Sequence, residues 1–523
     1  MLAGLGWLFV SVFPAGAQFD PAKAYRESAA VAARFAEPAT RYDTPAFATN
    51  KPDFTSQDEM MAFLEMLALR SPLLRLEREA RSQQGREIPV AVLSRSQVEV
   101  GSGARPVLLI IGQQHGNEPA GGEAALALVQ MLGGGPLAGL LDAVDVVIAP
   151  RANPDGAAAF VRALADGIDA NRDHTLLRTP EARVLAGLFA RFKPNVVLDC
   201  HEFTVGGRWL TKVGGLTRVD AMLQHATVPN LAPSLRTAAI ERVLPAMRTA
   251  LDAQGLSHDW YFTTDGARAD APVAMGGIGP DTGRNIAGLR NALSFLIETR
   301  GVGLGKANYA RRVHTHVVAA EAILRLLAND PQGFLALSRR AQAESAAGQG
   351  PLVVSARQEA QTRGLTFIDP VTGADRPVSV NWLSSLAIQP VLTRPRPAGY
   401  LVSANQTAAI AALARAGVTT RIMAGGKAVA GQRYRVVKLT SAAKADVRGD
   451  DTGAGEIVNG TYALEDELIQ PSQGDVFVAL DQPLAALVAV LMEPESTAGL
   501  VTNRLIGAQE GQLLPFARLM GAP

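Results

Sequence analysis

The sequence contains one cysteine in 523 residues, Cys200. A single thiol cannot form an intrachain disulfide, so cross-links of that kind contribute nothing to the fold. A lone cysteine can also be a thiol nucleophile, but Cys200 ends the largely apolar run of residues 196–200. This position favours a buried structural cysteine, because free cysteine is among the most often buried residue types.

An excess of charge of either sign is also absent. The sequence has 50 Lys and Arg residues against 49 Asp and Glu residues, a formal net charge of +1. This balance does not support nucleic-acid binding or electrostatic attachment to a membrane. Hydrophobic residues make up 48% of the chain, so it can bury a large core, and its length indicates two or three domains.

No Lys or Arg precedes the first apolar run, residues 2–13, although a basic start is usual for signal peptides. Ala15-Gly16-Ala17 then fits the small-x-small cleavage pattern, so we expect residues 1–17 to be a signal peptide. A membrane anchor is the alternative, but the run is too short to span a bilayer comfortably. The sequence therefore predicts an exported protein, periplasmic or secreted, without stable membrane insertion.

Strand-like apolar runs in the first two thirds of the chain end in polar clusters. The runs cover residues 107–112, 144–150, 195–200 and 292–297, and helical patterns cover residues 121–132, 180–192, 234–253 and 284–293. This alternation predicts an α/β fold with a doubly wound, mostly parallel sheet. In such sheets ligands bind beyond the carboxyl ends of the strands, which is where the polar clusters fall.

The same pattern suggests a division into domains. We expect residues 18–51 to be an N-terminal extension and residues 52–333 to be the catalytic domain, closed by a helix over 308–328. Residues 334–350, rich in Ala, Gln, Ser and Gly, are predicted to be a helical linker. Strand-like and helical runs alternate again over 351–523, without a metal, phosphate or nucleophile motif, and predict a smaller α/β accessory domain.

A histidine and a glutamate follow the first of these strands. His115 and Glu118 are three residues apart, where a strand ends and a helix begins. Zinc accepts both ligand types, but for this pair alone a solvated surface turn is an equal alternative. A zinc hydrolase needs a third protein ligand and an open position for water, and His201 is the histidine that follows another strand. The three residues predict a site for one Zn²⁺ ion.

A carboxylate and guanidinium groups complete the predicted chemistry. Glu298 ends an apolar strand and can act as the general base. Glu202 is the alternative base, but alternation along a strand turns it away from the metal. Arg162 and Arg172 lie in the segment expected to roof the cleft, where guanidinium groups can bind an oxyanion or a carboxylate. The alternative for both arginines is a solvated surface ion pair.

Several ordered motifs resemble one enzyme family. GREIPV, HGNE, NPDG, GIDANRD, DCHE and ETRG, spread over residues 52–330, resemble the zinc metallocarboxypeptidases of the carboxypeptidase A-like family, in particular an exported bacterial member. The resemblance implies His115, Glu118 and His201 as zinc ligands and Glu298 as general base and acid. It further implies that Arg162 polarises the scissile carbonyl, and that Asn171 and Arg172 hold the substrate's terminal carboxylate.

The sequence departs from the family pattern in two places. The family's usual Asn-Arg-Asn reads Asn171-Arg172-Asp173, and its mobile tyrosine has no clear match, Tyr261 being the nearest. Arg284, 14 residues before Glu298, stands about where the family has its specificity residue. There it implies a preference for acidic terminal residues or for the carboxylates of a murein-type diamino acid. The alternative is an ion pair of Arg284 with Asp281 at a helix.

The predicted function is therefore a zinc-dependent metallocarboxypeptidase that hydrolyses C-terminal peptide bonds, with Glu298 as general base. Its predicted substrate is a peptide or peptide-like molecule with a free carboxylate, and no nucleic acid. An amidase or deacylase acting on murein peptides or N-acyl amino acids is the alternative with the same chemistry. A non-catalytic zinc-binding module is the third hypothesis, and the presence of Glu298 argues against it.

Overall fold

The computed structural model describes residues 19–78, 80–96, 98–268, 270–348, 350–446, 448–449 and 451–523. The predicted signal peptide, residues 1–17, lies outside the described residues. Among the helices of the described residues, none combines the length and the apolar composition that crossing a bilayer requires.

The largest sheet carries the strands predicted from the apolar runs. In the described part of the chain it has eight strands in the order β1-β2-β4-β3-β5-β11-β7-β8. Their bounds are β1 Leu74–Glu77, β2 Val90–Leu93, β3 Val107–Gly112, β4 Asp145–Ala149, β5 Val196–Thr204, β7 Ala221–His225, β8 His258–Trp260 and β11 Leu293–Val302. Strands β4, β3, β5 and β11 are mutually parallel, whereas β1, β2 and β7 join antiparallel neighbours. The sheet is mixed, with the predicted parallel arrangement at its centre.

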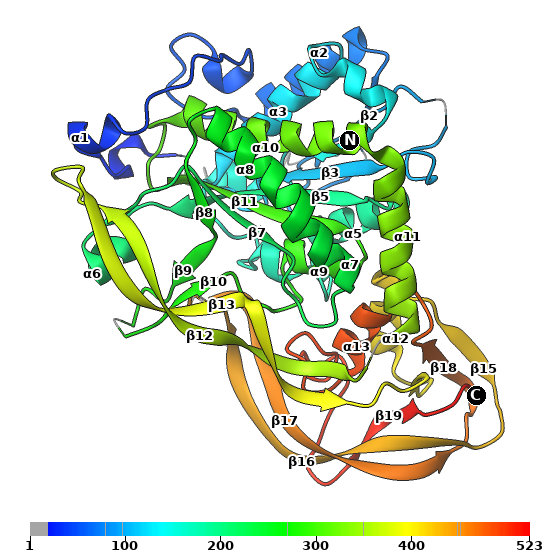
Figure 1. The fold of residues 1–523 in the computed structure, drawn as a ribbon. Helices are drawn as coiled ribbons and strands as arrows, with labels where there is room; N and C mark the ends of the chain where they lie inside the picture. Colours follow the sequence, from blue (N-terminus) through cyan, green and yellow to red (C-terminus); the bar gives the residue numbers. More distant parts are fainter. Residues whose placement is uncertain are drawn as a thin grey trace, which may run out of the picture.

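Helices cover both faces of this sheet (Figure 1). The helices of this part of the chain have the bounds α2 Gln57–Arg70, α3 Pro119–Leu132, α4 Pro154–Ala159, α5 Pro180–Phe192, α6 Arg208–Val213, α7 Pro233–Ala238, α8 Leu244–Ala253, α9 Gly283–Leu289, α10 Tyr309–Asn329 and α11 Pro331–Ala347. Leu108 and Ile110 of β3 pack in one core with α3, α8 and α10, while Leu109 and Ile111 pack in another with α5. Successive side chains of a strand point to opposite faces, so both faces of the central strands are apolar.

Two helix boundaries show how the sequence sets local structure. Ser56 caps α2 and forms a reciprocal capping box with Glu59, as its acidic first turn predicts. The helix predicted over 284–293 ends earlier, at Leu289, because Asn291 adopts a left-handed conformation (φ 64°) and the chain then enters β11.

Two further sheets lie toward the C-terminus. In the described residues one has the order β6-β12-β13-β10-β9 and the other β15-β18-β14-β19-β16-β17. The first set of bounds is β6 Leu216–Thr217, β9 Phe262–Thr264, β10 Val273–Met275, β12 Leu352–Ile368 and β13 Asp375–Arg394. The second is β14 Gly399–Val402, β15 Arg421–Ala424, β16 Val429–Ala445, β17 Asp451–Ile469, β18 Gln473–Ala479 and β19 Leu513–Leu519, with helices α12 Thr407–Arg415 and α13 Ala485–Met492.

These sheets connect the two predicted domains. Strand β13 pairs with β10, and β12 pairs with β6, so one sheet contains strands from both sides of the predicted boundary. Most of the predicted linker, residues 334–350, lies in helix α11. The domain division remains a proposal, and the C-terminal region contacts the catalytic region through paired strands.

Candidate metal centre and active site

A tight turn between β3 and α3 carries the first two predicted ligands. A Cβ atom at Gly116 would lie 1.9 Å from the carbonyl carbon of Gly156, so the turn can approach α4 only with glycine at this position. Glu118 stands at the N-cap of α3, and a Cβ atom at Gly121 would lie 2.8 Å from Cβ of Cys200. Helix α3 is therefore pressed against β5, which carries His201.

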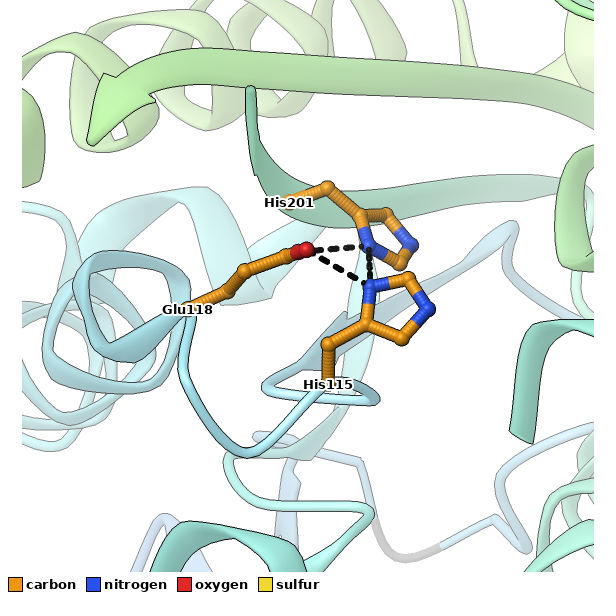
Figure 2. A group of neighbouring side chains, drawn as sticks. All are labelled: His115, Glu118 and His201. Carbon is orange, nitrogen blue, oxygen red and sulfur yellow. Dashed lines mark hydrogen bonds and ion pairs between the residues drawn. The ribbon is translucent and has the colours of Figure 1, made fainter. Parts of the chain in front are cut away.

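The structure brings His115, Glu118 and His201 together (Figure 2). Nδ1 of His115 lies 3.0 Å from Nδ1 of His201. The Glu118 carboxylate lies 2.8 Å from His115 Nδ1 through one oxygen and 2.9 Å from His201 Nδ1 through the other. Two atoms that both bind zinc at about 2.0–2.1 Å cannot be more than about 4.2 Å apart, and these distances satisfy that limit.

Two carboxylates that the sequence analysis did not single out stand behind the histidines. Asp169 Oδ1 lies 3.0 Å from His115 Nε2, and Asp199 Oδ1 lies 3.0 Å from His201 Nε2. A carboxylate that accepts the Nε2 proton leaves the Nδ1 lone pair of the same ring for a metal. Both histidines are thus arranged as metal ligands usually are. Asp169 belongs to the GIDANRD motif, but nothing in the local pattern distinguishes it from its polar neighbours.

The electrostatic environment of these donors suits a cation. Burial opposes ionisation of Glu118, yet His115 and His201 lower its pKa well below the usual value. Burial also disfavours a charged His201, yet Asp199 and Glu118 raise its pKa well above the usual value. Three buried acidic groups therefore surround two imidazoles, and the donor set fits zinc in charge and ligand type.

Glu298 lies next to this centre. Strands β5 and β11 are parallel, and their register pairs Glu298 with His201, so the two side chains share a face. The residue is 8% exposed. Burial and the neighbouring Glu118 carboxylate raise the pKa of Glu298 to about 7, although His201 and Arg162 act in the opposite sense. Such a carboxylate can accept and return a proton near neutral pH.

Glu202 is directed elsewhere, as strand alternation predicts. Its carboxylate accepts a hydrogen bond from the backbone N–H of Ala120 at 3.0 Å and forms a buried ion pair with Arg312 at 2.5 Å. Glu202 therefore holds α3 and α10 against β5.

Of the two predicted arginines, Arg162 contacts the metal-ligand group and Arg172 lies beside it. Arg162 Nη1 donates to Glu118 Oε1 at 3.0 Å, and its Nε and Nη2 donate to Asp169 Oδ2 at 3.1 and 3.0 Å. Arg172 Nη2 donates to Asp446 Oδ2 at 2.8 Å. Asn171 accepts a hydrogen bond from the Gly283 N–H at 2.6 Å, and its Nδ2 lies 3.3 Å from His201 Nε2. The carboxylates that pair with Arg162 and Arg172 are buried, so neither arginine forms a fully solvated surface ion pair.

A cavity of about 390 Å³ opens beside the centre. Its lining includes all of the predicted catalytic and substrate-binding residues, namely Arg162, Asn171, Arg172, Tyr261, Arg284 and Glu298. It also includes Lys444, Asp446, Arg448 and Thr452 from the β16–β17 hairpin, which the sequence analysis did not connect with the site. These residues lie far from the site in sequence and reach it only through the tertiary fold.

Arg284 and Tyr261 occupy one wall of this cavity. Arg284 is 4% exposed and donates through Nη2 to the Gly277 carbonyl at 2.6 Å. Within the described residues no carboxylate forms an ion pair with it, and Asp281 pairs instead with Lys444 at 3.0 Å. Burial lowers the pKa of Arg284 to about 10 and, together with Glu298, raises that of Tyr261 to about 12.

His174, His314, His316 and Cys200 are buried and lie outside the group of metal ligands. His174 Nε2 lies 2.8 Å from Gln114 Oε1, and His174 is not among the residues that line the cavity. His314 bonds with Tyr42 at 2.7 Å and His316 with Thr299 at 3.1 Å, both within the core. Burial raises the pKa of the Cys200 thiol well above its usual value, which makes it a poor nucleophile.

Comparison with known proteins shows what the chain is similar to. The profile of the family described as "Zinc carboxypeptidase" matches residues 60–183. "Probable carboxypeptidase 2" of Trichophyton verrucosum (strain HKI 0517) is 31% identical over 421 residues, 76% of this chain and 80% of the relative. "Carboxypeptidase 2" of Trichophyton equinum is 28% identical over 536 residues, 99% of this chain and 98% of the relative. These relatives are fungal and do not support the expectation of a bacterial member.

Solved structures that resemble this chain have a lower sequence identity to it. The metallo-carboxypeptidase from Burkholderia cenocepacia is 18% identical, covers 52% of this chain and 69% of its own, and has a TM-score of 0.41. A metallo-carboxypeptidase from Pseudomonas aeruginosa is 21% identical over 52% of this chain and 69% of its own, with a TM-score of 0.38.

Proposed function

The chain belongs to the zinc carboxypeptidase family, and from this premise we propose which of its residues carry out the reaction. The protein is a zinc-dependent metallopeptidase that hydrolyses C-terminal peptide bonds. The roles of individual residues, the substrate preference and the export of the protein are our proposals.

One zinc ion is proposed to bind through His115 Nδ1, the Glu118 carboxylate and His201 Nδ1. The observation that carries this proposal is the convergence of these atoms at 2.8–3.0 Å, with Asp169 and Asp199 behind the two rings. Three protein ligands leave a position for water, as catalytic zinc sites require. Zinc, when bound, makes that water more acidic and polarises the scissile carbonyl.

Glu298 is proposed to move the proton. Its carboxylate accepts a proton from the attacking water and later donates it to the amine that leaves. The pKa near 7 serves both transfers, because the group gives up and regains a proton over a small free-energy range. Burial keeps bulk water from taking over either transfer.

The guanidinium groups are proposed to bind the substrate. Arg162 donates to the carbonyl oxygen of the scissile bond as negative charge develops there, since its Nη1 already lies at the ligand atoms of Glu118. Arg172, with Asn171, binds the free carboxylate of the substrate's last residue in the cavity. Tyr261, which lines the same cavity, is proposed to close over the substrate.

Arg284 is proposed to set the preference for the last side chain. A buried guanidinium that has no carboxylate partner is costly, and a substrate carboxylate would supply that partner. Glycine at position 276 leaves room for the Arg284 guanidinium, because a Cβ atom there would lie 2.7 Å from Arg284 Nη2. The preferred substrates are therefore peptides ending in an acidic residue, or murein-type peptides whose diamino acid carries an additional carboxylate.

Product analysis tests both the recognition of a free C-terminal carboxylate and the role of Arg284 in selecting the last side chain. Peptides that end in Glu, Lys or Phe are incubated with the wild type and with Arg284→Ala, each peptide with a free and with an amidated C-terminus. We expect release of the last residue from free peptides, fastest for Glu, and a loss of that preference in Arg284→Ala. A wild type that prefers Phe or Lys, with no change in the variant, refutes the role of Arg284. Equal cleavage of amidated peptides refutes recognition of the free carboxylate and favours an amidase.

We further propose that residues 1–17 direct export and are removed. In the same proposal residues 18–51 are an extension, 52–333 the catalytic domain, 334–350 a linker and 351–523 an accessory domain. Mass spectrometry of the secreted protein tests the first proposal, since its N-terminus should be Gln18.

A further inference from the structure

The tip of the β16–β17 hairpin reaches the active-site cavity. This hairpin belongs to the C-terminal region and extends from it toward β10 of the catalytic region (Figure 1). Lys444, Asp446, Arg448 and Thr452 line the cavity that Glu298 and Arg172 also line. Arg448 in addition lines a second cavity, of about 120 Å³, on the side of Glu118 and Phe203. The hairpin tip thus borders the cleft on both sides of Glu298.

Backbone and side-chain contacts dock the tip against the catalytic region. The Thr452 carbonyl accepts a hydrogen bond from the Asp169 N–H at 3.0 Å. A Cβ atom at Gly453 would lie 2.3 Å from the Gly167 carbonyl oxygen, so glycine permits a close approach of the two backbones. Lys444 forms an ion pair with Asp281 at 3.0 Å, and both side chains are largely buried. These separate contacts hold Lys444, Thr452 and Gly453 of the hairpin against the catalytic region.

Asp446 bridges two guanidinium groups. Its Oδ2 accepts from Arg172 Nη2 at 2.8 Å and from Arg448 Nε at 2.7 Å, and its Oδ1 accepts from the Arg448 backbone N–H at 2.8 Å. The Asp446 side chain is 3% exposed and those of both arginines are 13% exposed. Two buried cations repel each other, and a shared carboxylate allows them to lie side by side.

The bridge ends at the catalytic centre. Arg448 Nη2 lies 3.4 Å from Asp169 Oδ2, the oxygen that also accepts from Arg162. A row of alternating charges therefore runs from Arg172 through Asp446 and Arg448 to Asp169. Asp446 is held by several donors and cannot leave Arg172 for the solvent without exposing two buried cations to each other.

We propose that the C-terminal region completes the substrate site, and that Asp446, held in place by Arg448, is a positioning residue that fixes Arg172 for the terminal carboxylate of the substrate. This inference rests on the role proposed above for Arg172. Without Asp446 the long Arg172 side chain regains rotamer freedom, which substrate binding must then remove. The binding of substrate weakens, whereas Asp446 and Arg172 are not the groups that exchange a proton with Glu298 in the proposed reaction.

Asp446→Asn tests this role, with Asp466→Asn as the matched control. Asp466 is exposed and lies on the same hairpin, where it bonds with Gln432. On a peptide with a free C-terminus, we expect Asp446→Asn to raise KM about tenfold, which corresponds to the cost of ordering about one arginine side chain. We expect its kcat and zinc content to stay near those of the wild type, and Asp466→Asn to change nothing.

A double-mutant cycle separates positioning from general damage to the fold. If Asp446 acts through Arg172, adding Asp446→Asn to Arg172→Ala changes KM by less than about twofold, since coupled residues are not additive. A full further tenfold rise in the Arg172→Ala background overturns the proposal, and so does an unchanged KM in Asp446→Asn alone. If Arg172→Ala leaves KM unchanged while the wild type releases C-terminal residues, the role of Arg172 fails, and this inference with it. A loss of kcat in Asp446→Asn with normal KM overturns only this inference.

Discussion

Asp169 is predicted to serve both the metal and Arg162, and this double role can be measured. Its Oδ1 contacts His115 Nε2 and the Asn171 N–H at 3.0 and 2.8 Å, and its Oδ2 accepts two bonds from Arg162. Burial opposes ionisation, yet Arg162 and His115 keep the pKa of Asp169 well below its usual value. Asp169→Asn therefore removes a full negative charge at every working pH and places an amide against donors.

Asp199 provides the matched comparison. It stands behind His201 as Asp169 stands behind His115, but it accepts its other hydrogen bond from Gln114 Nε2, at 2.5 Å, and not from an arginine of the cavity. Replacing a carboxylate that orients a metal-binding histidine typically costs about 10- to 100-fold in metal affinity or activity. We expect both Asp169→Asn and Asp199→Asn to lose zinc affinity on this scale.

The two variants should differ once zinc is saturating. Asp199→Asn should then recover kcat to within about threefold of the wild type, because only metal binding depended on it. Asp169→Asn should remain at least about tenfold slower, since the charge-assisted bonds that hold Arg162 are each worth about 1.5–3 kcal/mol. The assay is a zinc titration against a competing chromogenic chelator, followed by kcat at saturating zinc. Equal recovery of both variants would refute the proposed link between Asp169 and Arg162.

The other predictions concern the ligands, the substrate carboxylate and pH. His201→Ala should abolish tight zinc binding in metal analysis. His174→Ala should retain zinc, because the His174 side chain contacts Gln114 and none of the donor atoms. A normal zinc content in His201→Ala would exclude the three-ligand site. Arg172→Ala should raise KM mainly for peptides with a free C-terminus. Amidation of the peptide's C-terminus should therefore raise KM far more for the wild type than for the variant. Equal increases in both enzymes would contradict binding of the terminal carboxylate by Arg172. Glu298 must be ionised to accept a proton, so kcat/KM should fall as the pH drops through the pKa of Glu298. A bound cation lowers that pKa from the value of about 7, so the midpoint should lie below pH 7. A midpoint well above pH 7 would contradict the assignment.

The central strands were predictable because their residues obey local rules. The runs at 107–112, 195–200 and 292–297 are apolar on both faces, and each ends where polar residues begin, which marks the carboxyl edge of a buried parallel sheet. The same rule predicts that His115, Glu118, His201 and Glu298 lie at one edge of the sheet. Their roles in catalysis remain proposals.

The residues missed by the sequence analysis depend on tertiary contacts. Asp199 lies inside an apolar strand next to Cys200, and only the packing of Gln114 and His201 reveals its role. Asp446 and Arg448 lie in a region without any recognisable motif, and the long β12–β13 and β16–β17 hairpins have polar, weakly patterned sequences. A hairpin whose two faces differ little gives no local signal of its register or of the surface on which its tip docks.

We propose Glu298 as the general base, and the Glu298→Gln variant tests this role directly. The rate of release of the last residue from a free peptide is compared between the wild type and Glu298→Gln, at equal zinc content. We expect the rate to fall by at least about two orders of magnitude in the variant, the usual scale for loss of a general base. Turnover near that of the wild type in zinc-loaded Glu298→Gln would contradict it.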